Sequence, residues 1–179
     1  MQKHAAAIVL VSVVAGCSGD NVTGLTANAS AITATSATIR AAAATHVSGS
    51  CETTAAAPPV VTFPILREED IGVCQLSHLG RTAFHAFRVV NLATGTQTAE
   101  ITLTAANGDL LRTTDVSMRT AFLPTSFLFT GTTTIVSGTG RFANATGTLQ
   151  AEGEVDLISG AASFAYDGRI AYDASDRSN

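Results

Sequence analysis

Residues 147 to 157 alternate strictly between small or apolar side chains and polar ones. Leu149 and Val155 fall on one side of an extended chain, whereas Glu152 and Glu154 fall on the other. A period of two is that of a β-strand with one face on a core and the other face in water. Apolar residues on an amphipathic helix recur every three to four positions instead. The segment therefore predicts an antiparallel strand.

Seven further segments show the same alternation or are bounded by turn signals. They cover residues 47–54, 71–77, 83–92, 98–105, 109–116, 126–136 and 161–172. Asn107-Gly108 predicts a hairpin between two of them, because both residue types tolerate positive φ. Ile158-Ser159-Gly160 predicts another. Eight short strands joined mainly by hairpins predict an all-β fold, a closed antiparallel up-and-down barrel, because closure removes exposed edges. A β-sandwich is the alternative.

An eight-stranded barrel has an interior that is filled by side chains or holds one small ligand. The 46% apolar content of the 179-residue chain is enough for one domain with a core of its own. We assign the barrel to residues 46–173 and a short tail to residues 174–179.

The first 16 residues have the order of a signal peptide. Lys3 precedes an apolar run at residues 5–15, which at about eleven residues is shorter than the roughly 20 that a transmembrane helix needs. Val14-Ala15-Gly16-Cys17 resembles the bacterial lipobox, in which the cysteine becomes the lipidated N-terminus. We therefore expect an exported lipoprotein of the cell envelope, held at the outer membrane or the periplasmic face through Cys17. An ordinary signal peptide with a chance cysteine is the alternative.

Residues 17–45 differ in composition from the rest of the chain. They are almost entirely Ala, Thr, Ser, Gly and Asn, which bury little surface. We interpret them as a flexible tether with a root-mean-square reach of roughly 30 Å. The alternative is an extra strand at residues 32–39, since Thr and Ile favour extended structure.

Two cysteines remain if Cys17 is acylated. An even number of cysteines in an oxidising compartment suggests a disulfide between Cys51 and Cys74. Two buried thiols or one reactive cysteine are the alternatives.

The charge of the mature chain excludes one class of partner. Lys3 is the only lysine, so removal of the signal peptide leaves nine arginines against 14 acidic residues and a net charge of about −5. The arginines are scattered along the sequence, and no basic face for nucleic acid is expected. Membrane contact is therefore assigned to the lipid anchor.

Three stretches carry a family resemblance: Cys74-Gln-Leu-Ser-His-Leu-Gly-Arg81, Ala105-Ala-Asn-Gly-Asp109 and Ser137-Gly-Thr-Gly-Arg-Phe-Ala-Asn-Ala-Thr-Gly147. Together they resemble the allene oxide cyclase-like and dirigent-like barrel group, over roughly residues 46–173. Ser137 and Asn144 replace glycines that are more usual in the group. The resemblance implies the barrel fold. Allene oxide cyclase rearranges a fatty-acid epoxide inside its barrel and dirigent proteins guide radical coupling without a cofactor, but no positions for either activity can be matched here.

The third stretch also has a physical interpretation of its own. Its glycines permit tight turns, and its apolar side chains are suited to plug a barrel end. We assign Gly138, Gly140, Arg141, Phe142, Ala145 and Gly147 to such a closure. A phosphate-binding glycine loop is disfavoured because no lysine follows and no helix begins there.

Polar residues predicted inside the barrel are the candidates for a site. His85 and Arg88 fall on opposite faces of one strand, so one of them should point inward. An inward Arg88 needs a partner, and Asp167, Glu52 and Asp115 are the candidates. Glu68-Glu69-Asp70 is interpreted as a solvated loop. His46, His78 and His85 lack metal-ligand spacing, so neither a metal nor a cofactor is expected.

These features favour a noncatalytic lipoprotein whose barrel binds a small apolar molecule or an envelope partner. A cofactor-free isomerase or cyclase acting on a reactive hydrophobic substrate is the first alternative, and it requires an ionisable group in a water-poor pocket. A structural or interaction module is the second, and it would show large apolar patches on the outer wall.

Overall fold

The computed structural model describes residues 43 to 172. The described chain forms nine strands and one 3-10 turn, in the order β1 (Thr45–Ala55), β2 (Val60–Thr62), β3 (Ile65–Leu76), β4 (Gly80–Asn91), β5 (Thr96–Ala105), β6 (Leu110–Phe122), β7 (Ser126–Gly138), η1 (Gly140–Phe142), β8 (Thr146–Asp156) and β9 (Ala162–Ala171). The expected signal peptide, Cys17, the tether up to residue 42, the extra strand at 32–39 and the tail at 174–179 lie outside the described residues.

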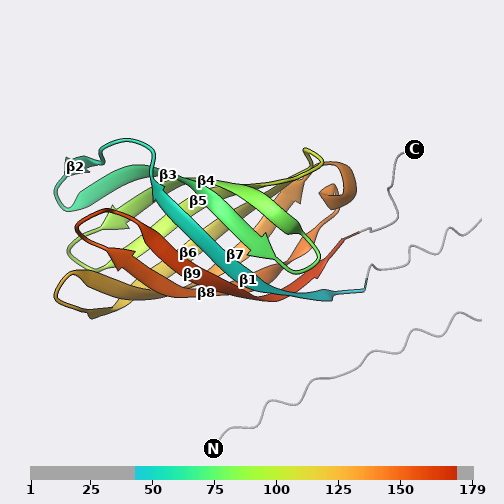
Figure 1. The fold of residues 1–179 in the computed structure, drawn as a ribbon. Helices are drawn as coiled ribbons and strands as arrows, with labels where there is room; N and C mark the ends of the chain where they lie inside the picture. The colour runs from blue at the N-terminus through green and yellow to red at the C-terminus, as the bar shows by residue number, and fades with distance from the viewer. Residues whose placement is uncertain (1–42, 173–179) are drawn as a thin grey trace, which may run out of the picture. The chain divides into compact units, whose positions relative to one another are not determined.

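Eight of these strands form the closed antiparallel barrel that the sequence predicts (Figure 1). Neighbours run in the order β1-β9-β8-β7-β6-β5-β4-β3, and β1 also pairs with β3. That pairing closes the sheet on itself and rules out the sandwich. The short strand β2, which the sequence pattern does not predict, pairs only with β3 and lies outside the closed ring.

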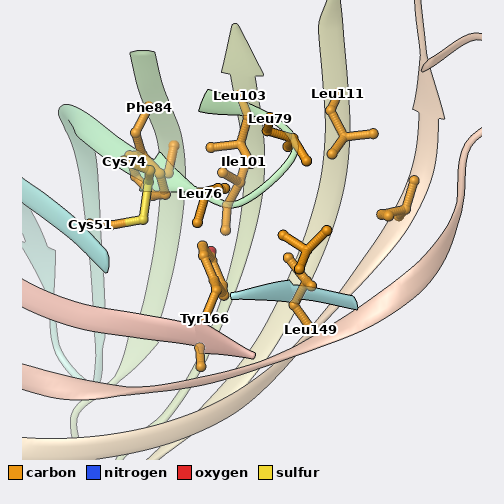
Figure 2. Packing of buried hydrophobic residues seen from close by; sticks show 14 of the residues in the cluster. Cys51, Cys74, Leu76, Leu79, Phe84, Ile101, Leu103, Leu111, Leu149 and Tyr166 are labelled. Carbon is orange, nitrogen blue, oxygen red and sulfur yellow. A yellow bond between two sulfur atoms is a disulfide. The ribbon is translucent and has the colours of Figure 1, made fainter. Parts of the chain in front are cut away.

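The two faces of β8 differ in burial, as the alternating sequence predicts. Leu149 and Ala151 are buried, whereas Gln150, Glu152 and Glu154 are exposed. On β9, Phe164 and Tyr166 point inward and pack edge to face, with ring centroids 5.3 Å apart. These inward side chains join the buried cluster shown in Figure 2. Burial of this apolar lining is the main term that stabilises the barrel.

The disulfide joins Cys51 of β1 to Cys74 of β3 (Figure 2). The two cysteines are direct partners in the ladder between these strands, and both are fully buried. The covalent bond therefore lies inside the barrel and crosses the seam at which the ring closes. An intact disulfide is typical of an oxidising, extracytoplasmic environment.

One end of the barrel is plugged by the segment between β7 and β8. Phe142 in η1 is almost fully buried, as is Ala145 beside it. Arg141 stacks on Phe142, and its side chain donates a 3.4 Å hydrogen bond to the Leu79 carbonyl oxygen. The Asp109 carboxylate lies 3.9 Å from the Arg141 guanidinium. This end, which also carries the start of β1, is called the closed end below.

Strand β3 begins earlier than expected. Glu68-Glu69-Asp70 was expected to be a solvated loop, but all three residues lie within β3. Glu68 and Asp70 point inward, and Arg88 on β4 is the ladder partner of Glu68. The interpretation as a loop was wrong because an arginine across the ladder stabilises carboxylates on the inner face of a strand. No helix in the described part of the chain is both long and apolar enough to cross a membrane.

Candidate functional site

A cavity of about 420 Å³ lies at the end of the barrel opposite the closed end. This end is called the mouth. The apolar lining comes from the strand ends and turns that meet there, and includes Leu66, Val90, Phe122, Phe127, Val155 and Leu157. Glu68, Gln97, Arg119 and Asp156 contribute polar groups to the same cavity. An apolar hollow of this size with a few polar groups is typical of a small-molecule site.

Arg88 lies below the mouth, inside the barrel. Its Nη2 atom is 3.1 Å from Asp70 Oδ2 and its Nη1 atom is 3.7 Å from Glu68 Oε1. The Asp70 contact is ionic only, because the geometry at Oδ2 does not satisfy a hydrogen bond. One buried cation is therefore shared between two carboxyl groups.

The Glu68 and Asp70 carboxyl groups hold their protons more tightly than usual. Burial raises the pKa of Glu68 above its ordinary value, the Arg88 charge partly opposes this, and the Asp70 charge adds to it. Burial likewise raises the pKa of Asp70 against the opposing effect of Arg88. Desolvation outweighs the attraction of the shared guanidinium in both cases. The cavity is thus lined by a carboxyl group, that of Glu68, whose pKa is raised above its ordinary value.

A second carboxylate, Asp115 on β6, is fixed by two hydroxyl groups. Ser117 Oγ donates a 2.6 Å hydrogen bond to Asp115 Oδ2, and Thr133 Oγ1 donates a 2.7 Å bond to Oδ1. Burial raises the pKa of the nearby Tyr166 phenol, and the Asp115 charge raises it further. Tyr166 therefore remains a neutral phenol beside Asp115.

The two groups of polar residues meet around a small internal cavity. Arg88, Asp115 and Tyr166 line a space of about 20 Å³, which is enough for one water molecule. Gln97 lines both this space and the mouth cavity. A water-sized space therefore lies in the polar layer of the interior, below the apolar lining of the mouth cavity.

Of His85 and Arg88, one was expected to point inward, and the structure shows that this residue is Arg88. His85 lies on the outer wall, and so does Asp167, which was also a candidate for the interior. His85 Nε2 is 2.6 Å from Glu69 Oε1, and His46 Nε2 is 2.9 Å from Asp167 Oδ2. His85 is an odd number of residues from Arg88, and Asp167 directly follows the inward Tyr166, so both face outward.

The partners of Arg88 also differ from those expected. Asp167, Glu52 and Asp115 were the candidates, but Asp70 and Glu68 form the ion pairs. Glu52 instead accepts a 3.0 Å hydrogen bond from Ser163 Oγ on the exposed face. The sequence did hold the missing signal, because Glu68 and Asp70 lie at even spacing from Cys74 and so share its inward face.

Arg119 and Gln97 were not singled out from the sequence. Arg119 continues the inward series of β6 beyond Asp115 and Ser117, at a spacing of two. Its guanidinium carbon lies 4.0 Å from the Phe122 ring centroid. Between residues 43 and 172, no carboxylate lies within ion-pair distance of Arg119. The mouth therefore contains one cation without an acidic partner in the described chain.

Comparison with solved structures supports the architecture. The structure of the pterocarpan synthase dirigent protein GePTS1 aligns with a TM-score of 0.53 and 18% identity, over 74% of this chain and 87% of that chain. The pterocarpan synthase dirigent protein PsPTS1 aligns at 14% identity and a TM-score of 0.35, over 74% of this chain and 97% of that one. Neither a protein-family model nor a curated protein matches the sequence. The closed strand order and the structural similarity to GePTS1 both show that the chain folds as a dirigent-like barrel of the allene oxide cyclase-like type.

Proposed function

We propose that this protein is an exported, lipid-anchored binding protein whose barrel mouth takes up an apolar small molecule with an acidic end. The observation that carries the proposal is the 420 Å³ mouth cavity, which is mainly apolar and contains an unpaired arginine among the described residues. A filled interior would have argued against binding. The cavity is instead of the size that small ligands occupy.

Arg119 gives the chemistry of the ligand's polar end. A guanidinium in a hollow with apolar walls favours a carboxylate or a similar anion, because charge-assisted hydrogen bonds strengthen where water is excluded. Two carboxyl groups, those of Glu68 and Asp156, lie in the same cavity. The raised pKa of Glu68 lessens its repulsion of an anionic ligand, and Asp156 Oδ1 already accepts hydrogen bonds from the backbone N–H groups of Ile158 and Ser159. An apolar tail would pack against side chains such as Phe127 and Val155.

A fluorescent fatty acid and its methyl ester provide the test. We expect the acid to bind about tenfold more tightly than the ester, and Arg119→Met to abolish this preference. Val155→Trp should fill the cavity and prevent binding of both probes. Val116→Trp, on the exposed outer face of β6, is the matched control. Unchanged binding in Val155→Trp would show that the mouth is not the site.

The lipid anchor has its own test. The disulfide supports an oxidising compartment, and the Val-Ala-Gly-Cys motif supports acylation at Cys17. The wild-type protein should enter the detergent phase on phase separation and should carry the mass of the acyl groups in mass spectrometry. Cys17→Ser should show neither property. Wild-type protein without any added acyl mass would rule out the anchor.

A catalytic role is the second candidate, and the raised pKa of Glu68 favours it. A carboxyl group that keeps its proton to higher pH is suited to protonate an epoxide or carbonyl oxygen in a dry pocket. The test is turnover of an unsaturated fatty-acid epoxide, followed by mass spectrometry. Turnover that is lost in Glu68→Gln while the fluorescent acid still binds would establish catalysis. Equal rates of epoxide conversion with and without protein would rule out catalysis and leave binding as the function.

A further inference from the structure

The connections that surround the mouth contain no charged residue. They comprise residues 56–64, which include the short strand β2, and residues 92–95, 123–125 and 157–161. Asp156, the last residue of β8, borders them, and its Oδ1 atom accepts hydrogen bonds from the backbone N–H groups of Ile158 and Ser159. The loops at the closed end do carry titratable side chains, namely His78, Asp109 and Arg141. The two ends of one barrel therefore differ in chemistry, although both are turns between strands.

Large apolar side chains are exposed on these mouth loops. Phe63 is 78% exposed and Ile158 is 81% exposed, and Val60, Val61, Leu123 and Leu157 are exposed as well. Within residues 43–172, the closed-end loops contribute no exposed large apolar residue, because Leu79 and Phe142 are buried in the plug. Figure 1 shows β2 and the β8–β9 turn at the end of the barrel away from the first residue of β1. We call Phe63, Leu123, Leu157 and Ile158 the apolar rim.

We propose that the apolar rim docks on a lipid bilayer, with the mouth facing the membrane. Apolar loop tips without charges can enter the interface between head groups and acyl chains at little desolvation cost. A protein partner would more often meet a surface with a polar and charged margin. The mature chain has a net charge of about −5 and no basic cluster, so attraction to anionic lipids does not contribute.

The mouth cavity, which would hold the proposed ligand, shares residues with this exposed surface. Phe122 and Leu157 line the cavity, and both are also exposed. An apolar molecule could therefore pass between bilayer and barrel without crossing water. This last step rests on the proposed function, whereas docking rests on the rim alone.

The length of chain before β1 permits this orientation. Residues 18–44 can span at most roughly 90 Å when fully extended. The longest strands of the barrel have 13 residues, which correspond to about 43 Å. A chain acylated at Cys17 is therefore long enough to hold the closed end away from the bilayer and let the mouth reach the same membrane.

Tryptophan fluorescence tests the orientation directly, because the natural chain contains no tryptophan. Ile158→Trp and Phe63→Trp place the probe on the rim. Val116→Trp places it on the outer wall, and Asn107→Trp places it in an exposed closed-end turn. Each full-length protein is mixed with phosphatidylcholine vesicles whose acyl chains are either natural or brominated.

We expect a blue shift and loss of emission in brominated vesicles for the two rim probes only. The effect should persist at high salt and should not increase with phosphatidylglycerol. Emission from residue 158 that stays unshifted and unquenched in vesicles would overturn the proposal, as would quenching of residue 107 instead. A concentration-dependent blue shift without vesicles would also overturn it, because the rim would then be covered by a second copy of the chain. The assay needs no ligand, so it is independent of fatty-acid binding.

Discussion

Arg88 Nη2 lies 3.1 Å from Asp70 Oδ2 inside the closed barrel, in the layer just below the mouth. This ion pair connects two neighbouring strands, β3 and β4, and the Glu68 carboxyl group shares the same cation. Buried charges of this kind are tolerated only when they are paired. The pair therefore couples stability to pH at the place where a ligand would be bound.

Replacing Arg88 by Met should destabilise the barrel by about 3 kcal/mol at pH 7, because Asp70 and Glu68 would remain buried without a cation. The loss should be smaller near pH 4, because the raised pKa of both carboxyl groups favours their protonation as the pH falls. Denaturant unfolding at the two pH values measures the difference. Arg112→Met, at an exposed position on β6, should change the free energy of unfolding by less than about 0.5 kcal/mol. An equal effect of both substitutions would contradict the structural role of Arg88.

Glu68→Gln should flatten part of the pH dependence of stability. The folded protein keeps the Glu68 proton above the ordinary pKa of 4.5, whereas the unfolded chain releases it. Unfolding then releases a proton, so the stability contributed by this group is present at low pH and is lost as pH rises from 4.5 through the folded pKa.

The free energy of unfolding of the wild-type protein minus that of Glu68→Gln should therefore decrease with rising pH across this window. Urea titrations at closely spaced pH values measure it. Glu154→Gln, at an exposed position on β8, is the control and should show no such trend. A difference that grows with pH would mean that Arg88, and not burial, dominates the environment of Glu68.

Removing the disulfide should weaken closure of the barrel. Cys51 and Cys74 are separated by 23 positions, so the crosslink closes a loop for which chain entropy gives about 3 kcal/mol of stabilisation. The double variant Cys51→Ala/Cys74→Ala should lose about this amount in denaturant unfolding. Titration of the unreduced, denatured wild-type protein should find neither of these two thiols free. A reactive thiol at either position would contradict the disulfide.

The fold was predictable because its strands repeat one simple pattern. On β8 and β9 the alternation of side chains is unbroken, and Asn107-Gly108 marks a turn that the structure contains. The short strand β2 was not predictable, because three exposed residues between Pro59 and Phe63 show no periodic pattern. Its pairing depends on the neighbouring edge of β3.

The site was harder to predict than the fold. The charged run at residues 68–70 looks like a solvated turn when it is considered alone. Glu68 and Asp70 can be placed inside only from two further facts: their even spacing from Cys74 and the presence of Arg88 across the ladder. Which of several acids pairs with an arginine depends on strand register, and register is a tertiary property. The mouth cavity likewise depends on how two separate turns and several strand ends come together.

Gly131 provides a test of packing around the polar layer. This residue lies on the inner face of β7, where it is the ladder partner of Ser117. A Cβ atom added at Gly131 would overlap Ser117 Cβ and lie 3.0 Å from Ser117 Cα. The side chain that holds Asp115 Oδ2 through a 2.6 Å hydrogen bond would be pushed aside.

Gly131→Ala should therefore destabilise the protein by about 2 kcal/mol, as overpacking of a closed interior does. Ser117→Gly removes the overlapping atom, at the cost of one hydrogen bond to Asp115. If overlap is the cause, Gly131→Ala should cost much less in the Ser117→Gly background, with a coupling of at least about 1 kcal/mol in a double-mutant cycle. Strictly additive effects in denaturant unfolding would show that Gly131 is needed for the backbone conformation of β7. Overlap with the Ser117 side chain would then not be the cause of the destabilisation.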